Sequence, residues 1–111
     1  MLRRFLRLVP LACLSGCVFW ANAPGEGPKA QRGYDEARAI ISALEAWKLN
    51  NGSYPTNLAE LVPSYLRRLP DFDFSYSIYA QSYTLLFSYA EAGMNDCVYT
   101  PTTKWRCSGY L

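Results

Sequence analysis

The chain has 111 residues, a formal net charge of +2 and hydrophobic side chains at half of its positions. This length fits one small domain, and the apolar content is that of a globular protein rather than a disordered one. The small net charge gives no reason to expect binding to nucleic acid. The sequence contains no histidine, the commonest general base and metal ligand, so we predict no catalytic site, no metal site and no enzymatic activity.

Residues 1–16 are predicted to be a targeting segment. Arg3, Arg4 and Arg7 form a positive region, and residues 8–14 form a short, largely apolar run. This order is typical of a secretory signal peptide. The run is shorter than the roughly 20 apolar residues that a helix needs to span a bilayer.

The end of this segment, Leu14-Ser15-Gly16-Cys17, resembles the lipobox of bacterial lipoproteins. The resemblance implies cleavage before Cys17, whose thiol would carry a diacylglycerol. Several acyl chains hold a protein firmly to a membrane, so this covalent lipid is the expected anchor, and no other cofactor is expected. In lipoproteins an aspartate after the cysteine favours the inner membrane. Val18 stands there instead, which favours the outer membrane of a bacterial cell envelope.

Two other interpretations of this segment stay open. Cleavage after Ala23 would use the small residues Ala21 and Ala23, although Pro24 would then follow the cut, which is a poor position for cleavage. An uncleaved anchor would require the apolar run to continue through Pro10.

Residues 17–33 are predicted to be the lipidated cysteine and a flexible tether. The stretch ANAPGEGPKAQRG, residues 21–33, is rich in glycine, proline, alanine and polar residues. We expect such a composition to bury little apolar surface and to give reach without a fixed orientation. The folded domain is therefore expected over residues 34–111.

Residues 34–51 are predicted to form the main helix. Asp35 and Glu36 would lie in its first turn and Lys48 in its last, each opposing the partial charge of the helix end. Gly52 marks the end, because glycine readily accepts the left-handed conformation of a C-terminal cap. Apolar side chains at steps of three and four residues form one stripe. The stripe consists of Ala37, Ile40, Ile41, Leu44 and Trp47.

The sequence after Gly52 predicts a turn and a second, short helix. The residue before Pro55 is pushed out of the helical region, so the first helix cannot continue. Asn57 stands three residues before Glu60, which is the spacing of a capping box. A short helix is therefore expected over residues 58–62.

Two runs within residues 71–89 alternate between apolar and polar side chains. Such alternation is typical of strands with one buried face, and the break at residues 80–82 predicts an antiparallel hairpin. Residues 91–96 are predicted to be a loop, and residues 97–107 a second hairpin that turns at Pro101. The side chains expected to face the helix are Phe72, Phe74, Tyr76, Ile78, Tyr83, Leu85, Phe87 and Tyr89.

The stretch from Tyr34 to Pro70 resembles part of the major pseudopilins of type II secretion and related type IV pilin-like proteins. The pieces IISALEAWKLNNG, GSYPT and LAELVPSYLRRLP occur in the order of the helix end and following loop of that family. SIYAQSYTLLFSYA is similar to its strand hairpin, so the likeness covers about residues 34–90. It implies an α+β domain, a pilin-like head with one N-terminal helix on a small antiparallel sheet.

The resemblance also implies a structural or interaction role near type II secretion or type IV pilus machinery. A pilin has a long apolar helix ahead of its head, and that helix builds the filament. Here a lipobox and a predicted tether take its place, so polymerisation through such a helix is not expected. A free-standing periplasmic or surface recognition module, unrelated to secretion, is the alternative.

The cysteine count fits this layout. Cys13 would leave with the leader and Cys17 would be lipidated, which leaves Cys97 and Cys107 as an even pair in an oxidising compartment. Their separation does not fit a CxxC redox pair, and no further cysteine or histidine remains to complete a zinc site. A disulfide is therefore predicted. Closing a loop of this size, about 11 residues, stabilises a domain by roughly 3 kcal/mol on the chain-entropy estimate.

Besides simple packing, the sequence allows two other kinds of site. Some pseudopilins hold calcium in the loops after the helix, and here Asp71, Asp73 and Asp96 could supply the oxygen ligands that calcium prefers. These three residues follow no fixed-spacing motif. Most of the tyrosines and tryptophans are expected in the core, and any exposed cluster would be a protein-binding surface. The expected contacts are thus a membrane, through the lipid, and a protein partner.

Overall fold

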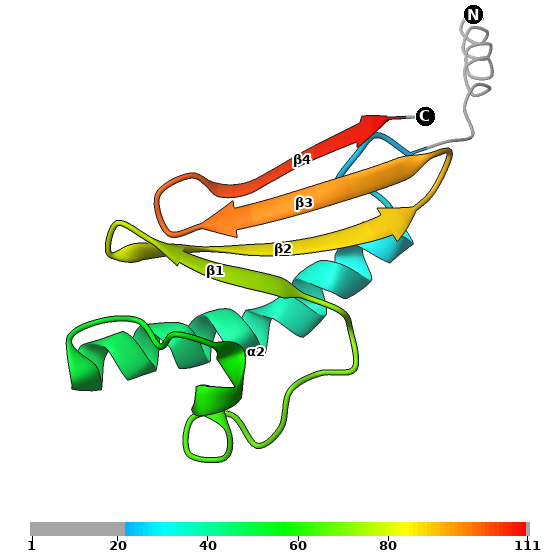
Figure 1. Ribbon diagram of the computed structural model, residues 1–111. Helices are drawn as coiled ribbons and strands as arrows, with labels where there is room; N and C mark the ends of the chain where they lie inside the picture. The colour runs from blue at the N-terminus through cyan, green and yellow to red at the C-terminus, as the bar shows by residue number, and fades with distance from the viewer. Residues whose placement is uncertain (1–21, 111) are drawn as a thin grey trace, which may run out of the picture.

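A four-stranded antiparallel sheet with one long helix on one face makes up the domain (Figure 1). The computed structural model describes residues 22–110. This arrangement confirms the predicted α+β class. Within these residues, no helix has both the length and the apolar character that crossing a membrane requires.

The strands form a meander in which each strand pairs with the next along the chain. β1 and β2 are joined at Ala80 and Gln81, both left-handed with φ of 49° and 62°. Two such residues twist a hairpin turn in the sense that matches paired strands. The last hairpin turns at residues 101–103, as predicted. The strands are β1 (Ser75–Tyr79), β2 (Ser82–Ala90), β3 (Met94–Thr100) and β4 (Lys104–Tyr110).

The long helix, α2 (Pro28–Asn51), begins earlier than the predicted start at Tyr34. Its first residue is a proline, which suits the first turn because the missing N–H would have no partner there. Gly27, with φ of 92°, turns the chain into the helix. Asp35 and Glu36 therefore lie beyond the first turn, and the prediction that they stabilise the helix N-terminus is wrong.

The early start of α2 also corrects the prediction of a flexible tether up to residue 33. Ala30 is completely buried. Gly33 lies so close to the ring of Phe87 that a β-carbon there would stand 2.2 Å from Cε1. The composition predicted no burial because these residues offer little apolar surface. Their small size is the reason for their burial, since it lets the helix backbone approach β2 closely.

The other end of α2 agrees with the prediction. Gly52 is left-handed, with φ of 85°, and its N–H donates to the Lys48 carbonyl at 2.7 Å. This satisfies one of the carbonyls left free at a helix end. The short element that follows, η3 (Leu58–Leu61), is a 3₁₀-helix, and the Asn57 side-chain oxygen accepts from the Glu60 N–H at 3.2 Å.

The core lies between α2 and the inner face of the sheet. Alternate residues of β2 face the helix, which confirms the predicted alternation. Ile41 and Trp47, predicted members of the helix stripe, are half-buried at the border of this core. The fully or nearly fully buried members of the stripe and the strand are Ala37, Ile40, Leu44, Tyr83, Leu85, Phe87 and Tyr89.

The strand ends differ from the predictions in detail. Phe72 and Phe74 lie ahead of β1 and are half-buried there. Ile78 is 40% exposed, because β1 is an edge strand with a neighbour on only one side. β3 begins at Met94, so the loop predicted over residues 91–96 is a tighter turn.

Leu44→Ala should lower the free energy of unfolding by about 2–5 kcal/mol, as the loss of a fully buried leucine side chain does. Leu49→Ala is the matched control, because Leu49 lies on the same helix and is 85% exposed. Its effect should stay within about 0.5 kcal/mol. Urea unfolding followed by circular dichroism measures both. Equal midpoints for the two variants would show that the stripe does not face the core.

Gly33→Ala should destabilise the domain by about 1–3 kcal/mol, because the added methyl group overpacks the contact with Phe87. The sign of the change in unfolding free energy distinguishes a packed from an unpacked position. In an unpacked helix the same change stabilises by up to about 1 kcal/mol, since alanine is the better helix former. Phe87→Leu added to Gly33→Ala should recover part of the loss by making room. A higher unfolding midpoint for Gly33→Ala than for the wild type would refute the close packing.

Candidate functional site

Cys97 and Cys107 form the predicted disulfide, with their sulfur atoms 2.08 Å apart. The two residues lie opposite each other on β3 and β4. Cys97 is completely buried and packs with Phe87 and Ala30, so the first turns of α2 cover this bond. Cys17, the predicted lipidation site, lies outside the described residues and stays a prediction.

Tyr34 connects the disulfide to the segment ahead of α2. Its hydroxyl donates to the Gly25 carbonyl oxygen at 2.8 Å and lies 3.3 Å from Sγ of Cys107. Its ring packs against Phe87 and Trp105, with centroids 5.8 and 5.0 Å away. Burial raises the pKa of the Tyr34 hydroxyl, so it stays protonated and able to donate further into the alkaline range than a free tyrosine does.

Residues 22–27, which we call the docked segment, lie against one end of the sheet. Three hydrogen bonds join this segment and the first turn of α2 to the end of β2 and the turn after it. They are donated by Gly25 N to Tyr89 Oη at 2.8 Å, by Asn22 Nδ2 to Glu91 Oε2 at 2.9 Å, and by Lys29 Nζ to Ala90 O at 2.7 Å.

These contacts define two poles of the domain (Figure 1). The N-terminal pole consists of the docked segment, the turn at residues 91–93 and the end of β4, where a β-carbon on Gly109 would stand 3.0 Å from Cγ of Pro24. The far pole consists of the C-terminal end of α2 and the turns at residues 80–81 and 101–103. The described chain thus begins and ends at the same pole.

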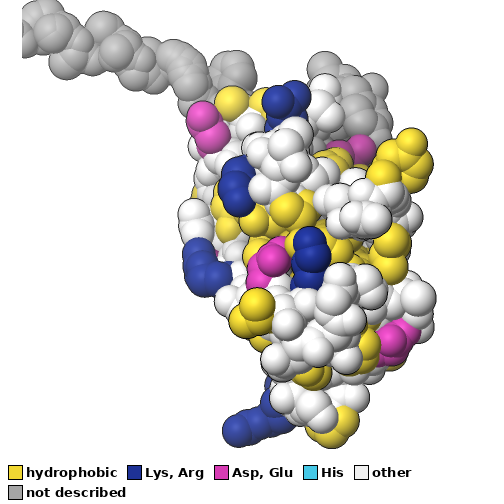
Figure 2. Space-filling view, turned by 90° about the vertical axis from the view of Figure 1, so that its left-hand side faces the viewer, with side chains coloured by type: hydrophobic (Ala, Val, Ile, Leu, Met, Phe, Trp, Pro, Cys, Tyr) yellow, Lys and Arg dark blue, Asp and Glu magenta, His cyan; other side chains and the backbone are white. Residues whose placement is uncertain are grey.

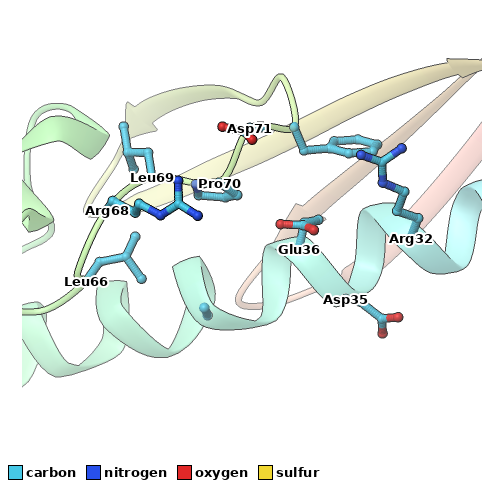
Figure 3. A pocket seen from close by; sticks show the side chains of 10 residues that line it. Arg32, Asp35, Glu36, Leu66, Arg68, Leu69, Pro70 and Asp71 are labelled. Carbon is cyan, nitrogen blue, oxygen red and sulfur yellow. The ribbon is translucent and has the colours of Figure 1, made fainter.

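A hollow of about 370 Å³ lies between α2 and the segment that leads to β1 (Figure 3). Glu36 points from the helix toward this segment, and Arg68 extends from the opposite side. The guanidinium carbon of Arg32 stands 5.3 Å from the centre of the Phe72 ring, a cation–π contact. The lining residues are Arg32, Asp35, Glu36, Ala39, Leu66, Arg68, Leu69, Pro70, Asp71 and Phe72.

The lining of this hollow has features of a recognition surface. Its lining contains charges of both signs and no serine, threonine, cysteine or lysine side chain that an adjacent base could activate. Side chains of mixed charge around a shallow depression match a polar protein surface with the opposite pattern. Sequence reasoning missed this hollow, because the segment around Arg68 has no periodic pattern.

The carboxylates considered for calcium do not come together. Asp96 lies on β3 and accepts from the Ser88 hydroxyl at 2.5 Å, whereas Asp71 and Asp73 are exposed ahead of β1. Over residues 22–110 no group of three acidic or cysteine side chains is placed to hold a metal ion.

Exposed large apolar side chains are found at both poles. Leu49 is 85% and Tyr79 is 79% exposed near the far pole, and Met94 is 43% exposed near the N-terminal pole. Figure 2 shows the face on the left of Figure 1, where apolar side chains are interspersed with basic and acidic ones. Apolar content alone marks no docking site on this face, because interfaces and ordinary surfaces are often equally apolar.

Four tyrosines gather between the sheet and the end of α2: Tyr54, Tyr76, Tyr83 and Tyr99. The Tyr54 hydroxyl donates to Oε2 of Glu45 at 2.9 Å, and the Tyr76 hydroxyl donates to the Pro55 carbonyl at 2.7 Å. Burial, reinforced by the hydrogen bond to Glu45, raises the pKa of Tyr54 to about 12. Burial also raises the pKa of Tyr76 to about 12.

Sequence reasoning did not find the docked segment, although one signal was present. A glycine followed by a proline at positions 27 and 28 is typical of a helix start.

Comparison with known proteins adds no relative, since no family model, curated protein or solved structure matches the chain. The geometry of the domain thus gives two candidate surfaces, the N-terminal pole and the hollow beside α2.

Raising the pH from 10 to 12 should lower the free energy of unfolding. An unfolded tyrosine ionises near pH 10, whereas Tyr54 and Tyr76 ionise near pH 12 in the folded domain. Below pH 10 both states are protonated and the full stability is present. Between these values the unfolded state loses its protons first, so stability falls.

Variants separate this effect from other alkaline titrations. Tyr54→Phe should make the decline shallower, and Tyr79→Phe should not, because Tyr79 is 79% exposed. Urea midpoints measured at several pH values give the slopes. Identical slopes for Tyr54→Phe and the wild type would contradict the raised pKa.

Proposed function

We propose that this chain is a lipid-anchored protein of the bacterial cell envelope, with a pilin-like domain that has a structural or interaction role linked to type II secretion or type IV pilus machinery. The observation that carries the proposal is the order of elements: α2 with its Gly52 cap, the loop containing η3, and then the antiparallel strands. The helix, loop and hairpin follow one another in the same order in the family that residues 34–90 resemble.

The anchor in this proposal is a lipid on Cys17, with the outer membrane favoured over the inner. The function is binding rather than catalysis. The sequence has no histidine, and the hollow beside α2 is lined by side chains suited to recognition. We expect the partner to be a protein, and we expect no nucleic acid and no cofactor besides the covalent lipid.

A free-standing recognition module is the second candidate, and the start of α2 favours it. Gly27 is left-handed and the residues ahead of it dock on the sheet, so the chain turns away from the helix axis. A filament-building stalk would instead continue α2 in a straight line. We therefore expect no filament assembled through a helix that extends α2.

A pull-down from solubilised envelope distinguishes the two candidates. The tagged full-length chain serves as bait, and the charge-reversal variant Arg68→Glu tests the hollow. Arg106→Glu is the matched control, because Arg106 is exposed on β4, away from the hollow. Recovery of secretion or pilus components that Arg68→Glu loses and Arg106→Glu keeps would support the first candidate. Capture of a partner set without such components would favour the second.

The lipid anchor has its own test. Radiolabelled palmitate should enter the wild-type chain in growing bacteria, and Cys17→Ser should abolish the label. Cys13→Ser is the control, because Cys13 lies in the predicted leader and should not affect labelling. Equal labelling of Cys17→Ser, or a mature protein that starts at Pro24, would contradict the anchor.

A further inference from the structure

The docked segment is hydrogen-bonded to the rest of the domain through the backbone of one residue, Gly25. Gly25 donates its N–H to Tyr89 and accepts from Tyr34 through its carbonyl. Gly25 is left-handed, with φ of 87°, and a β-carbon there would stand 2.8 Å from Sγ of Cys107. The segment is therefore a packed part of the fold.

This packing leaves a short connection to the predicted lipid. Only four residues separate Cys17 from Asn22, and Asn22 is already bonded to Glu91. Five steps of extended chain reach at most about 18 Å. A lipid on Cys17 would thus hold the N-terminal pole within that distance of the bilayer surface.

The side chains on the surface of the turn at this pole allow it to lie close to a bilayer. Ala90, Ala92 and Gly93 are exposed, and Met94 is 43% exposed. Glu91, the acidic residue of the turn, is half-buried: one of its carboxylate oxygens is bonded to Asn22 and the other is buried. The turn therefore presents small apolar side chains and a methionine, and its one carboxylate is half-buried and bonded to Asn22.

We propose that the N-terminal pole lies against a phospholipid surface and that the domain stands on the membrane in one orientation. This inference rests on the proposed lipid anchor. Exposed Lys29 and Glu26 place one charge of each sign at this pole, so the orientation is set by the short connection and the docked segment rather than by net charge. α2 rises about 1.5 Å per residue, which places Leu49 about 30 Å along the helix from Lys29.

The orientation is measured in vesicles reconstituted with the mature wild-type chain, purified in detergent from bacterial membranes. The vesicles consist of phosphatidylethanolamine and phosphatidylglycerol with a fraction of lipid that carries a nitroxide on its headgroup. A fluorophore is attached at Met94→Cys in one sample and at Leu49→Cys in another. Nitroxide quenches at short range, so we expect quenching to be several-fold stronger at position 94 than at position 49.

Releasing the docked segment should remove this difference. Tyr34→Phe with Tyr89→Phe deletes both hydrogen bonds to Gly25, and quenching at position 94 should fall toward that at position 49. Tyr79→Phe is the control, because that tyrosine is 79% exposed and lies near the far pole, and it should leave quenching unchanged. Near-ultraviolet circular dichroism confirms that each variant is folded.

Flotation of the same vesicles separates the two proposals. If the chain floats with the vesicles and both positions are quenched equally, the fixed orientation is wrong and the anchor stands. If the wild-type chain does not float, the anchor is wrong and the orientation falls with it. Should the double variant not fold, the comparison of positions 94 and 49 in the otherwise native chain decides the matter alone.

Discussion

The contact between Phe87 and Gly33 is the constraint on which the rest of the domain depends. Phe87 is completely buried at the middle of β2, and the missing side chain of Gly33 lets α2 settle onto its ring. Other aromatic rings also pack around Phe87, and aromatic pairs add about 0.5–1.5 kcal/mol each beyond the area that they bury. The rings that pack around Phe87 are those of Tyr34, Phe72, Phe74, Tyr89 and Trp105.

This cluster links features that are far apart in the chain. Tyr34 touches both Phe87 and the disulfide, and through Gly25 it fixes the segment that enters the domain. The disulfide joins β3 to β4 on the side of the sheet that α2 covers, so it packs against the same cluster. The N-terminal pole is therefore held by packing, a covalent bond and hydrogen bonds together. The far pole is held by the tyrosines around Tyr83.

Features with a regular pattern could be predicted from the sequence. The helix stripe, the alternation along β2, the Gly52 cap and the hairpin that contains the disulfide each follow from local spacing. The start of α2 could not be predicted in this way, because Ala30 and Gly33 are buried for their small size and add nothing to an apolar pattern. The hydrogen bond from Gly25 to Tyr89 was also hidden, since the two residues lie 64 positions apart.

The meander arrangement has a consequence for the way the chain folds. Strand order equals chain order, and the disulfide spans 10 residues, so the sheet is built from contacts that are local in sequence. Local contacts form quickly, because little loop entropy is lost in closing them. The bonds from Asn22 and Gly25 span 69 and 64 residues. The sheet should therefore assemble first, and the entering segment should close onto it as the final step.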